Sequence, residues 1–148
     1  MLLVEDNPTD VYVIKHVLQS CGLDLDLQIA HDGQEALHYL GEVAKSGERA
    51  RSGDLAKSET SSCLALVLLD LNTPKVEGIE VLRHLRSSPL FARTPVIIVT
   101  SSTAAVDRAA VEHLKAEAYF QKPRTLAAYM HLGALVKQFL RPTGQDPG

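Results

Sequence analysis

The chain has 148 residues, of which 45% are hydrophobic and 22% charged, and its formal net charge is −3. These values are typical of a globular protein that buries one sizeable core in a single domain. Because there is no large basic excess, nucleic acid is not an expected partner. No apolar run reaches membrane-spanning length and no signal peptide is recognisable, so no membrane partner is expected. Cys21 and Cys63 have neither metal-site spacing nor a secretory context, which favours reduced thiols and a cytoplasmic location.

Short apolar segments and helical apolar patterns alternate along the chain. Strands are predicted at residues 2–4, 25–30, 64–69, 95–100 and 118–121. Helices are predicted from a cap at Thr9 or Asp10 up to Gly22, from 34 to at least 40, over 78–85 and 104–114, and from a cap at Thr125 to about 140. This alternation predicts an α/β fold, a doubly wound five-stranded parallel sheet with five helices.

Two segments stand apart from this alternation. Residues 41–63 are rich in Lys, Arg, Glu, Ser and Gly, which predicts an extended, partly helical or mobile insertion within one domain spanning 1–148. The charged residues of this insertion favour a solvated loop, and a binding arm is the less favoured alternative. Residues 142–148 are expected to form a frayed tail.

The most informative stretch is the apolar run at 64–69, which is followed by Asp70 and Asn72. Such a run is typical of a strand buried on both faces of a parallel sheet. Ligands of open α/β sheets bind at the carboxyl ends of the strands, so Asp70 is a candidate for chemistry. The alternative is that Asp70 only caps a turn.

Other predicted strands also end in polar side chains: Glu5 and Asp6 after the first, Thr100 at the end of the fourth, and Lys122 after the fifth. If these ends meet, three carboxylates share one crevice and require a cation to remain ionised. All-oxygen ligation favours Mg²⁺, and the absence of a His/Cys set disfavours zinc. A metal, an ammonium and a hydroxyl around Asp70 indicate phosphoryl transfer onto that carboxylate.

In this order the motifs resemble a response-regulator receiver domain of bacterial two-component signalling, over roughly residues 2–140. The residues that carry the resemblance are Glu5-Asp6, Asp70 with Asn72, Pro74 and Gly78, Thr100-Ser101, Tyr119, and Lys122-Pro123. The resemblance implies a flavodoxin-like receiver fold and a phosphoryl group that passes from a phosphohistidine of a sensor histidine kinase to Asp70. Such a protein catalyses only its own phosphorylation and dephosphorylation and is not otherwise an enzyme.

The resemblance also implies a role for each site residue. Asp6 and Asp70 would ligate Mg²⁺ directly, Glu5 through water, and Asn72 through its main-chain carbonyl. Thr100 and Lys122 would bind the phosphoryl oxygens. Tyr119 would be the aromatic that swings inward with Thr100 when the protein switches, and Lys122-Pro123 would be a cis peptide, a form that is accessible only before proline.

Three local features resemble the regulators that are paired with bacterial and cyanobacterial phytochromes. They are the opening residues 2–8, the insertion before Asp70, and Lys-Pro-Arg-Thr at 122–125. They imply a stand-alone regulator of a phytochrome-type kinase. Two departures are noted: the first strand begins almost at Met1, so that it is shortened or the true start lies upstream, and no output domain follows residue 140, so DNA binding is not expected.

Two alternative functions remain open. A phosphatase resembling the haloacid dehalogenase family also uses a strand-end Asp with Mg²⁺, but it needs a second Asp two residues on, where this chain has Asn72. A degenerate receiver would act only as a protein-binding module, and the intact set of acidic residues, Thr100 and Lys122 argues against it.

The last predicted helix has two apolar sides. Leu132, Leu135, Val136 and Phe139 form the expected sheet-facing stripe. The opposite side carries Leu126, Ala127, Met130 and Ala134, and we expect Leu126, Met130 and Ala134 to lie at a two-fold homodimer interface with the neighbouring fifth strand and fourth helix. The alternative is scattered surface apolar residues, which are common.

Overall fold

The computed structural model describes residues 1–23, 26–51, 64–73 and 75–140, without the side chains of 46–51. Its strands form one parallel sheet in the order β2-β1-β3-β4-β5. The strands are β1 (Leu2–Val4), β2 (Gln28–Ala30), β3 (Val67–Leu69), β4 (Val96–Thr100) and β5 (Ala118–Gln121). The predicted doubly wound α/β fold is confirmed, although β2 is shorter than its alternating pattern predicts.

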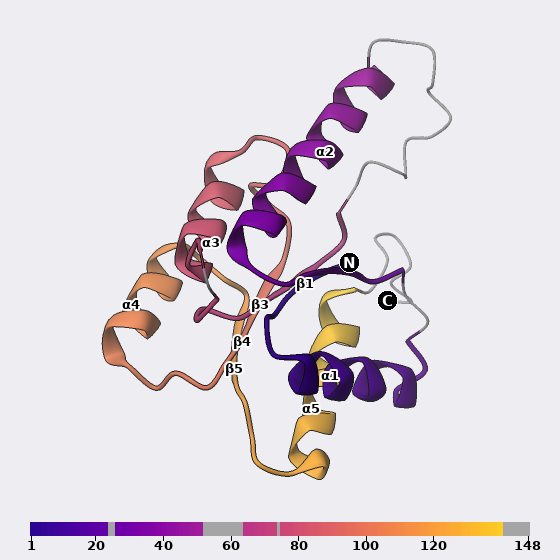
Figure 1. Ribbon diagram of the computed structural model, residues 1–148, viewed down its shortest axis with the longest axis vertical. Helices are drawn as coiled ribbons and strands as arrows, with labels where there is room; N and C mark the ends of the chain where they lie inside the picture. The colour runs from indigo at the N-terminus through magenta and orange to yellow at the C-terminus, as the bar shows by residue number, and fades with distance from the viewer. Residues whose placement is uncertain (24–25, 52–63, 74, 141–148) are drawn as a thin grey trace, which may run out of the picture.

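Helices cover both faces of the sheet: α1 (Pro8–Ser20), α2 (Gly33–Arg51), α3 (Gly78–Ser87), α4 (Ala105–His113) and α5 (Leu126–Phe139). Figure 1 shows α1 and α5 together on one face and α2, α3 and α4 on the other. Alternation along β1 divides the core accordingly, because Leu2 and Val4 point to the α2–α4 side and Leu3 to the α1–α5 side. Among the described helices, none has the length and apolar character needed to cross a membrane.

The start of α1 differs from the prediction in a way that matters for the site. Asn7 is the N-cap, and its side-chain oxygen accepts from the backbone N–H groups of Thr9 at 2.9 Å and Asp10 at 3.4 Å. Pro8 occupies the first turn, where its missing N–H costs nothing. The prediction that Thr9 or Asp10 caps the helix is therefore wrong, and the Asp10 side chain is available for another contact.

The predicted insertion is helical in its first half. α2 continues from Gly33 to Arg51, because the segment is rich in alanine and charged residues with high helix propensity. Tyr39 and Val43 lie half-buried against the core and anchor this extension. Residues 52–63, the rest of the predicted insertion, and the predicted tail at 142–148 lie outside the described residues.

The faces of α5 follow the prediction only in part. Leu132 and Val136 are buried, while Leu135 and Phe139 are half-buried against the same core. Met130, predicted on the opposite side, is also half-buried against this core, because the buried stripe includes Tyr129 and Gly133 and is wider than expected. Leu126 is 50% exposed, and Ala134 is exposed.

Candidate functional site

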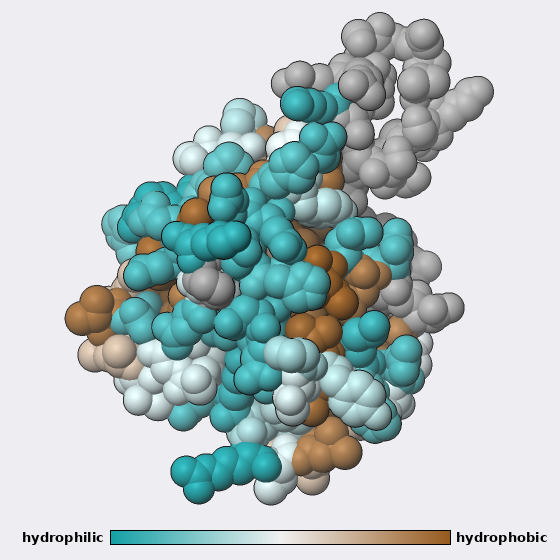
Figure 2. Space-filling view, in the orientation of Figure 1, coloured by the Kyte–Doolittle hydropathy of each residue, from teal (hydrophilic) through white to brown (hydrophobic). Residues whose placement is uncertain are grey.

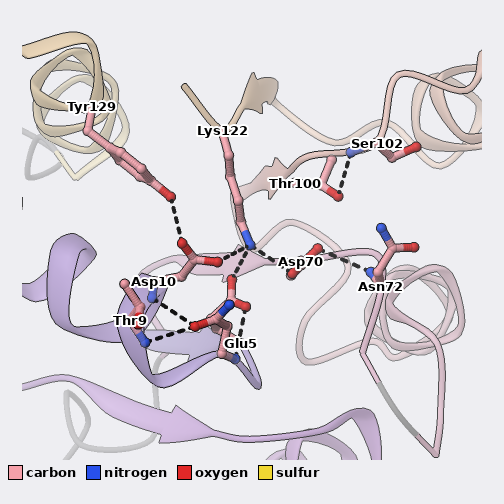
Figure 3. Close-up of polar contacts among 10 residues, drawn as sticks. Glu5, Thr9, Asp10, Asp70, Asn72, Thr100, Ser102, Lys122 and Tyr129 are labelled. Atoms are coloured by element: carbon pink, nitrogen blue, oxygen red, sulfur yellow. Dashed lines mark hydrogen bonds and ion pairs between the residues drawn. The ribbon is translucent and has the colours of Figure 1, made fainter. Parts of the chain in front are cut away.

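The predicted site residues meet at the carboxyl edge of the sheet. β1, β3, β4 and β5 are consecutive neighbours, so their ends lie side by side. Two backbone hydrogen bonds hold the ends in register: Asp70 N–H donates to Val4 O at 3.1 Å, and Lys122 N–H donates to Thr100 O at 2.8 Å. Figure 3 shows the side chains of Glu5, Asp70 and Lys122 converging in the resulting crevice.

The carboxylates of Glu5, Asp6 and Asp70 form a compact cluster. Each offers one oxygen, and these oxygens lie within 4.8 Å of one another. Glu5 is only 1% exposed and Asp70 5%, whereas Asp6 is exposed. Burial raises the pKa of the Glu5 carboxyl to about 7, although the Lys122 ammonium opposes the shift. Without a cation, Glu5 therefore resists ionisation at neutral pH.

Lys122 supplies the positive charge of the site. Its Nζ lies 2.8 Å from Glu5 Oε1, 2.8 Å from Asp10 Oδ2 and 3.0 Å from Asp70 Oδ2. Burial alone would lower the pKa of the ammonium, but the hydrogen bonds and charges of these carboxylates outweigh it and raise the pKa. Lys122 is therefore a permanent cation beside Asp70.

Hydrogen bonds orient the groups around Asp70. Asn72 N–H donates to Asp70 Oδ1 at 3.1 Å, so each carboxylate oxygen of Asp70 has a donor. Thr100 is fully buried at the end of β4, and its Oγ1 accepts from Ser102 N–H at 3.3 Å. A cavity of about 490 Å³ opens beside this edge and is lined in part by Asp6, Asn72 and Glu77. It offers an entry for a small or protein-borne substrate.

Tyr119 lies on β5 away from the carboxylates. Its hydroxyl donates to Ser102 O at 2.8 Å, and the Arg108 guanidinium stands 4.4 Å from the centre of its ring. These contacts connect Tyr119 to the loop that follows Thr100 and to α4. The side chain is half-buried in this arrangement and is not part of a purely apolar core.

The carboxylates fit a hard divalent cation. Glu5 Oε1 is buried and, apart from the ion pair with Lys122, has no hydrogen-bond partner among the described residues. Oxygen donors that converge in this way are the ligands that Mg²⁺ and Mn²⁺ prefer.

The comparisons with known proteins agree with this geometry. The chain matches the response regulator receiver domain over residues 1–132. It belongs to the response regulator receiver family. Response regulator Rcp1 of Synechocystis sp. is 35% identical over 126 residues, which cover 85% of this chain and 78% of that protein.

Two solved structures of similar receivers cover 99% of this chain at 30% identity. One is the phosphorylated cyanobacterial phytochrome response regulator RcpA, with a TM-score of 0.75 and 96% of its own chain covered. The other is the Mn²⁺-bound form of Rcp1, with a TM-score of 0.73 and 97% covered. The receiver family is a signalling family and not a classical enzyme family, which disfavours the phosphatase alternative.

In this receiver, the sequence located most of the site but missed Asp10 and Tyr129. Tyr129 OH points toward Asp10 Oδ1 at 3.5 Å, while the other oxygen of Asp10 binds Lys122 (Figure 3). The available signal was the position of Asp10 in the first turn of a helix that starts at the site edge. The assumption that Asp10 caps the helix concealed it.

The predicted cis peptide at Lys122-Pro123 is wrong. Among the described residues no peptide bond is cis. The trans form is intrinsically favoured by about 0.5–1 kcal/mol even before proline. Lys122 contacts its three carboxylates with this peptide bond in the trans form.

Proposed function

We propose that Asp70 accepts a phosphoryl group from a phosphohistidine of a sensor histidine kinase. A bond forms between an Asp70 carboxylate oxygen and phosphorus as the phosphorus–nitrogen bond of the donor breaks, and that electron pair returns to the imidazole. The observation that carries the proposal is the placement of Asp70, buried at a strand end and 3.0 Å from a permanent ammonium, while Asp6 and Asn72 line a cavity of about 490 Å³. The phosphorylated state of the similar RcpA supports it.

Each neighbouring side chain has a role in this proposal. Lys122 and Thr100 bind the oxygens of the transferred group, and the Lys122 ammonium neutralises part of its charge. Asp6 and Asp70 would hold Mg²⁺ directly, Glu5 would act through water, and Asn72 would contribute its main-chain carbonyl. When bound, the metal supplies the positive charge that lets an anionic donor approach the carboxylates. The Mn²⁺-bound form of the similar Rcp1 supports a divalent cation at this cluster.

The switch is proposed to run through Thr100 and Tyr119. Movement of the Thr100 hydroxyl toward the phosphoryl group would disturb the Ser102 segment, because Ser102 N–H bonds Thr100 Oγ1. The carbonyl oxygen of Ser102 also accepts the hydrogen bond from the Tyr119 hydroxyl, so a shift of Ser102 would release Tyr119 to turn inward. This exchange would carry the state of Asp70 to β5 and α4.

The kinase is proposed to be of the phytochrome type. The similarity to RcpA at 30% identity supports this, since RcpA is a cyanobacterial phytochrome response regulator. Phosphotransfer from a purified phytochrome kinase should be much faster than from a non-phytochrome histidine kinase under the same conditions. Equal rates from both kinases would contradict the pairing.

A two-fold homodimer through α5, β5 and α4 is also proposed, with Leu126, Met130 and Ala134 on the α5 side. Figure 2 shows small hydrophobic areas over α4 and over the start of α5, and Leu126 is 50% exposed and Val106 on α4 78% exposed. Sedimentation of the wild type and of Met130→Glu, with and without phosphorylation, tests the dimer. Because Met130 also contacts the core, Leu126→Glu is the cleaner second variant; monomers throughout would overturn the dimer.

The phosphoacceptor proposal is tested with acetyl phosphate. In the presence of Mg²⁺ we expect the intact mass to increase by one acid-labile phosphoryl group. No increase is expected when the metal is chelated or in the Asp70→Asn variant. Asp26→Asn, an exposed aspartate away from the crevice, is the matched control and should be phosphorylated like the wild type. An unmodified wild type would instead support the degenerate receiver that only binds a partner.

A further inference from the structure

Asp10 occupies a particular position among the partners of Lys122. Two of the three carboxylates that contact Nζ, Glu5 and Asp70, also belong to the cluster that fits a cation. Asp10 contacts Nζ at 2.8 Å but does not belong to that cluster. Its ion pair with Lys122 can therefore persist when the cluster takes up a cation or Asp70 is modified.

The start of α1 and the Tyr129 side chain of α5 together hold the Asp10 carboxylate in place. Asn7 caps α1 and places Asp10 in the first helical turn, where a negative charge is favourable. Tyr129 on α5 directs its hydroxyl to Oδ1 of Asp10 at 3.5 Å, and its partial burial and the charge of Asp10 raise the pKa of Tyr129 to about 12. At neutral pH this hydroxyl is protonated and donates toward Asp10. Figure 3 shows the chain from Tyr129 through Asp10 to Lys122.

We propose that Asp10 is a positioning residue that anchors the Lys122 ammonium at the α1–α5 side of the crevice during phosphoryl transfer. Lys122 carries a long, flexible stem, and the immobilisation of such a side chain is entropically costly. With Asp10 in place, the ammonium keeps one charged hydrogen bond while its other hydrogens turn from Glu5 and Asp70 to the transferred phosphoryl oxygens. Without Asp10, nothing outside the cation cluster pairs with Nζ among the described residues.

The inference rests on the proposed function of Asp70, and its tests separate the two. In Asp10→Asn we expect the rate of phosphorylation at saturating acetyl phosphate and Mg²⁺ to fall about tenfold, as for a misplaced catalytic group. The Mg²⁺ affinity should stay within about twofold of the wild type, because Asp10 is not in the cation cluster. Asp10→Glu, which keeps the charge, should recover part of the rate.

Tyr129→Phe and Asp26→Asn serve as matched variants. Removal of the Tyr129 hydroxyl leaves the Asp10–Lys122 pair intact. Tyr129→Phe should therefore lower the phosphorylation rate, but by less than Asp10→Asn does. Asp26→Asn should have no effect on the rate. A loss of melting temperature in Asp10→Asn with an unchanged rate would show a purely structural role, and a large loss of Mg²⁺ affinity would show that Asp10 is a ligand; either result overturns the inference.

A spectroscopic measurement is independent of phosphorylation. With Mg²⁺ bound, the two ε-methylene protons of Lys122 should give distinct NMR signals in the wild type, because the ammonium is anchored, and should merge in Asp10→Asn. If the wild type takes up no phosphoryl group but shows this difference, the proposed function fails and the anchor remains. If Lys122 is equally mobile in both proteins, the anchor fails whatever happens at Asp70.

Discussion

Glu5 provides a quantitative test of the electrostatics of the site. Its carboxyl is 1% exposed, and burial raises its pKa from 4.5 to about 7. The folded protein therefore binds this proton more tightly than the unfolded chain does, and the metal-free protein should lose stability as the pH rises from 4.5 to 7. At ~1.4 kcal/mol per pH unit, the loss amounts to about 3 kcal/mol.

The substitution Glu5→Gln removes this titration while the neutral side chain keeps its approximate shape. We expect the free energy of unfolding of the two proteins to be similar near pH 4.5, and Glu5→Gln to be more stable by about 3 kcal/mol at pH 8 without metal. Urea denaturation across this pH range in the presence of a chelator measures the difference. Glu112→Gln, an exposed glutamate on α4, is the control and should follow the wild type.

Added Mg²⁺ should reduce the stability difference between the two proteins. The cation stabilises the folded state in proportion to its affinity, and the Glu5 carboxylate contributes to that affinity in the wild type. The wild type should therefore gain more stability from millimolar Mg²⁺ than Glu5→Gln does. If Glu5→Gln is less stable than the wild type at pH 8 without metal, the assigned cost of the buried charge is refuted.

Three further substitutions give distinct outcomes. Asp6→Ala should weaken Mg²⁺ binding without lowering the melting temperature of the metal-free protein, because it removes one of three mutually repelling carboxylates. Titration calorimetry and thermal melts check this. A clear decrease in the melting temperature of the metal-free protein would count against it. Lys122→Ala should still bind Mg²⁺ but leave the NMR spectrum of α4 and β5 unchanged on phosphorylation, and a wild-type response would refute its role. Gly133→Ala should destabilise the fold by about 1–3 kcal/mol, since its Cβ would clash with Cys21 Sγ. Cys21→Ala should restore most of that stability, and denaturant unfolding that shows no rescue would exclude the clash.

Strand ends were the most predictable part of this protein. A buried apolar run followed by a carboxylate identifies both a central parallel strand and the edge to which it delivers a side chain, and Asp70 follows such a run at residues 67–69. Glu5, Thr100 and Lys122 follow the same pattern, and the structure brings Lys122 into contact with Glu5 and Asp70. The sheet order explains this meeting, because it places these strands next to one another.

Contacts made by helices were less predictable. Asp10 reaches Lys122 across 112 residues of sequence, and only the choice of Asn7 as the cap decides which way its side chain points. Several residues could cap this helix, and their preferences differ by less than about 1 kcal/mol. The extent of α2 was left open for a related reason: helix propensity is visible in residues 41–51, but a polar composition is equally typical of a loop.

The partial burial of Met130 shows the limit of a helical wheel. The wheel divides α5 into two sides, whereas packing against both the sheet and α1 buries a wider stripe. Gly133 allows this close approach, because Cys21 at the end of α1 lies against it. The small residue needed for helix contact is recognisable only once α1 and α5 are known to be neighbours.

The central claim is that Asp70 carries the phosphoryl group, and the most direct measurement locates that group. After reaction with acetyl phosphate and Mg²⁺, reduction of the acyl phosphate with borohydride and peptide mass mapping should place the modification on Asp70. The account predicts one modified residue, in the peptide that contains β3 and Asp70. A phosphoryl group found on a histidine or a serine, with Asp70 unmodified, would contradict it.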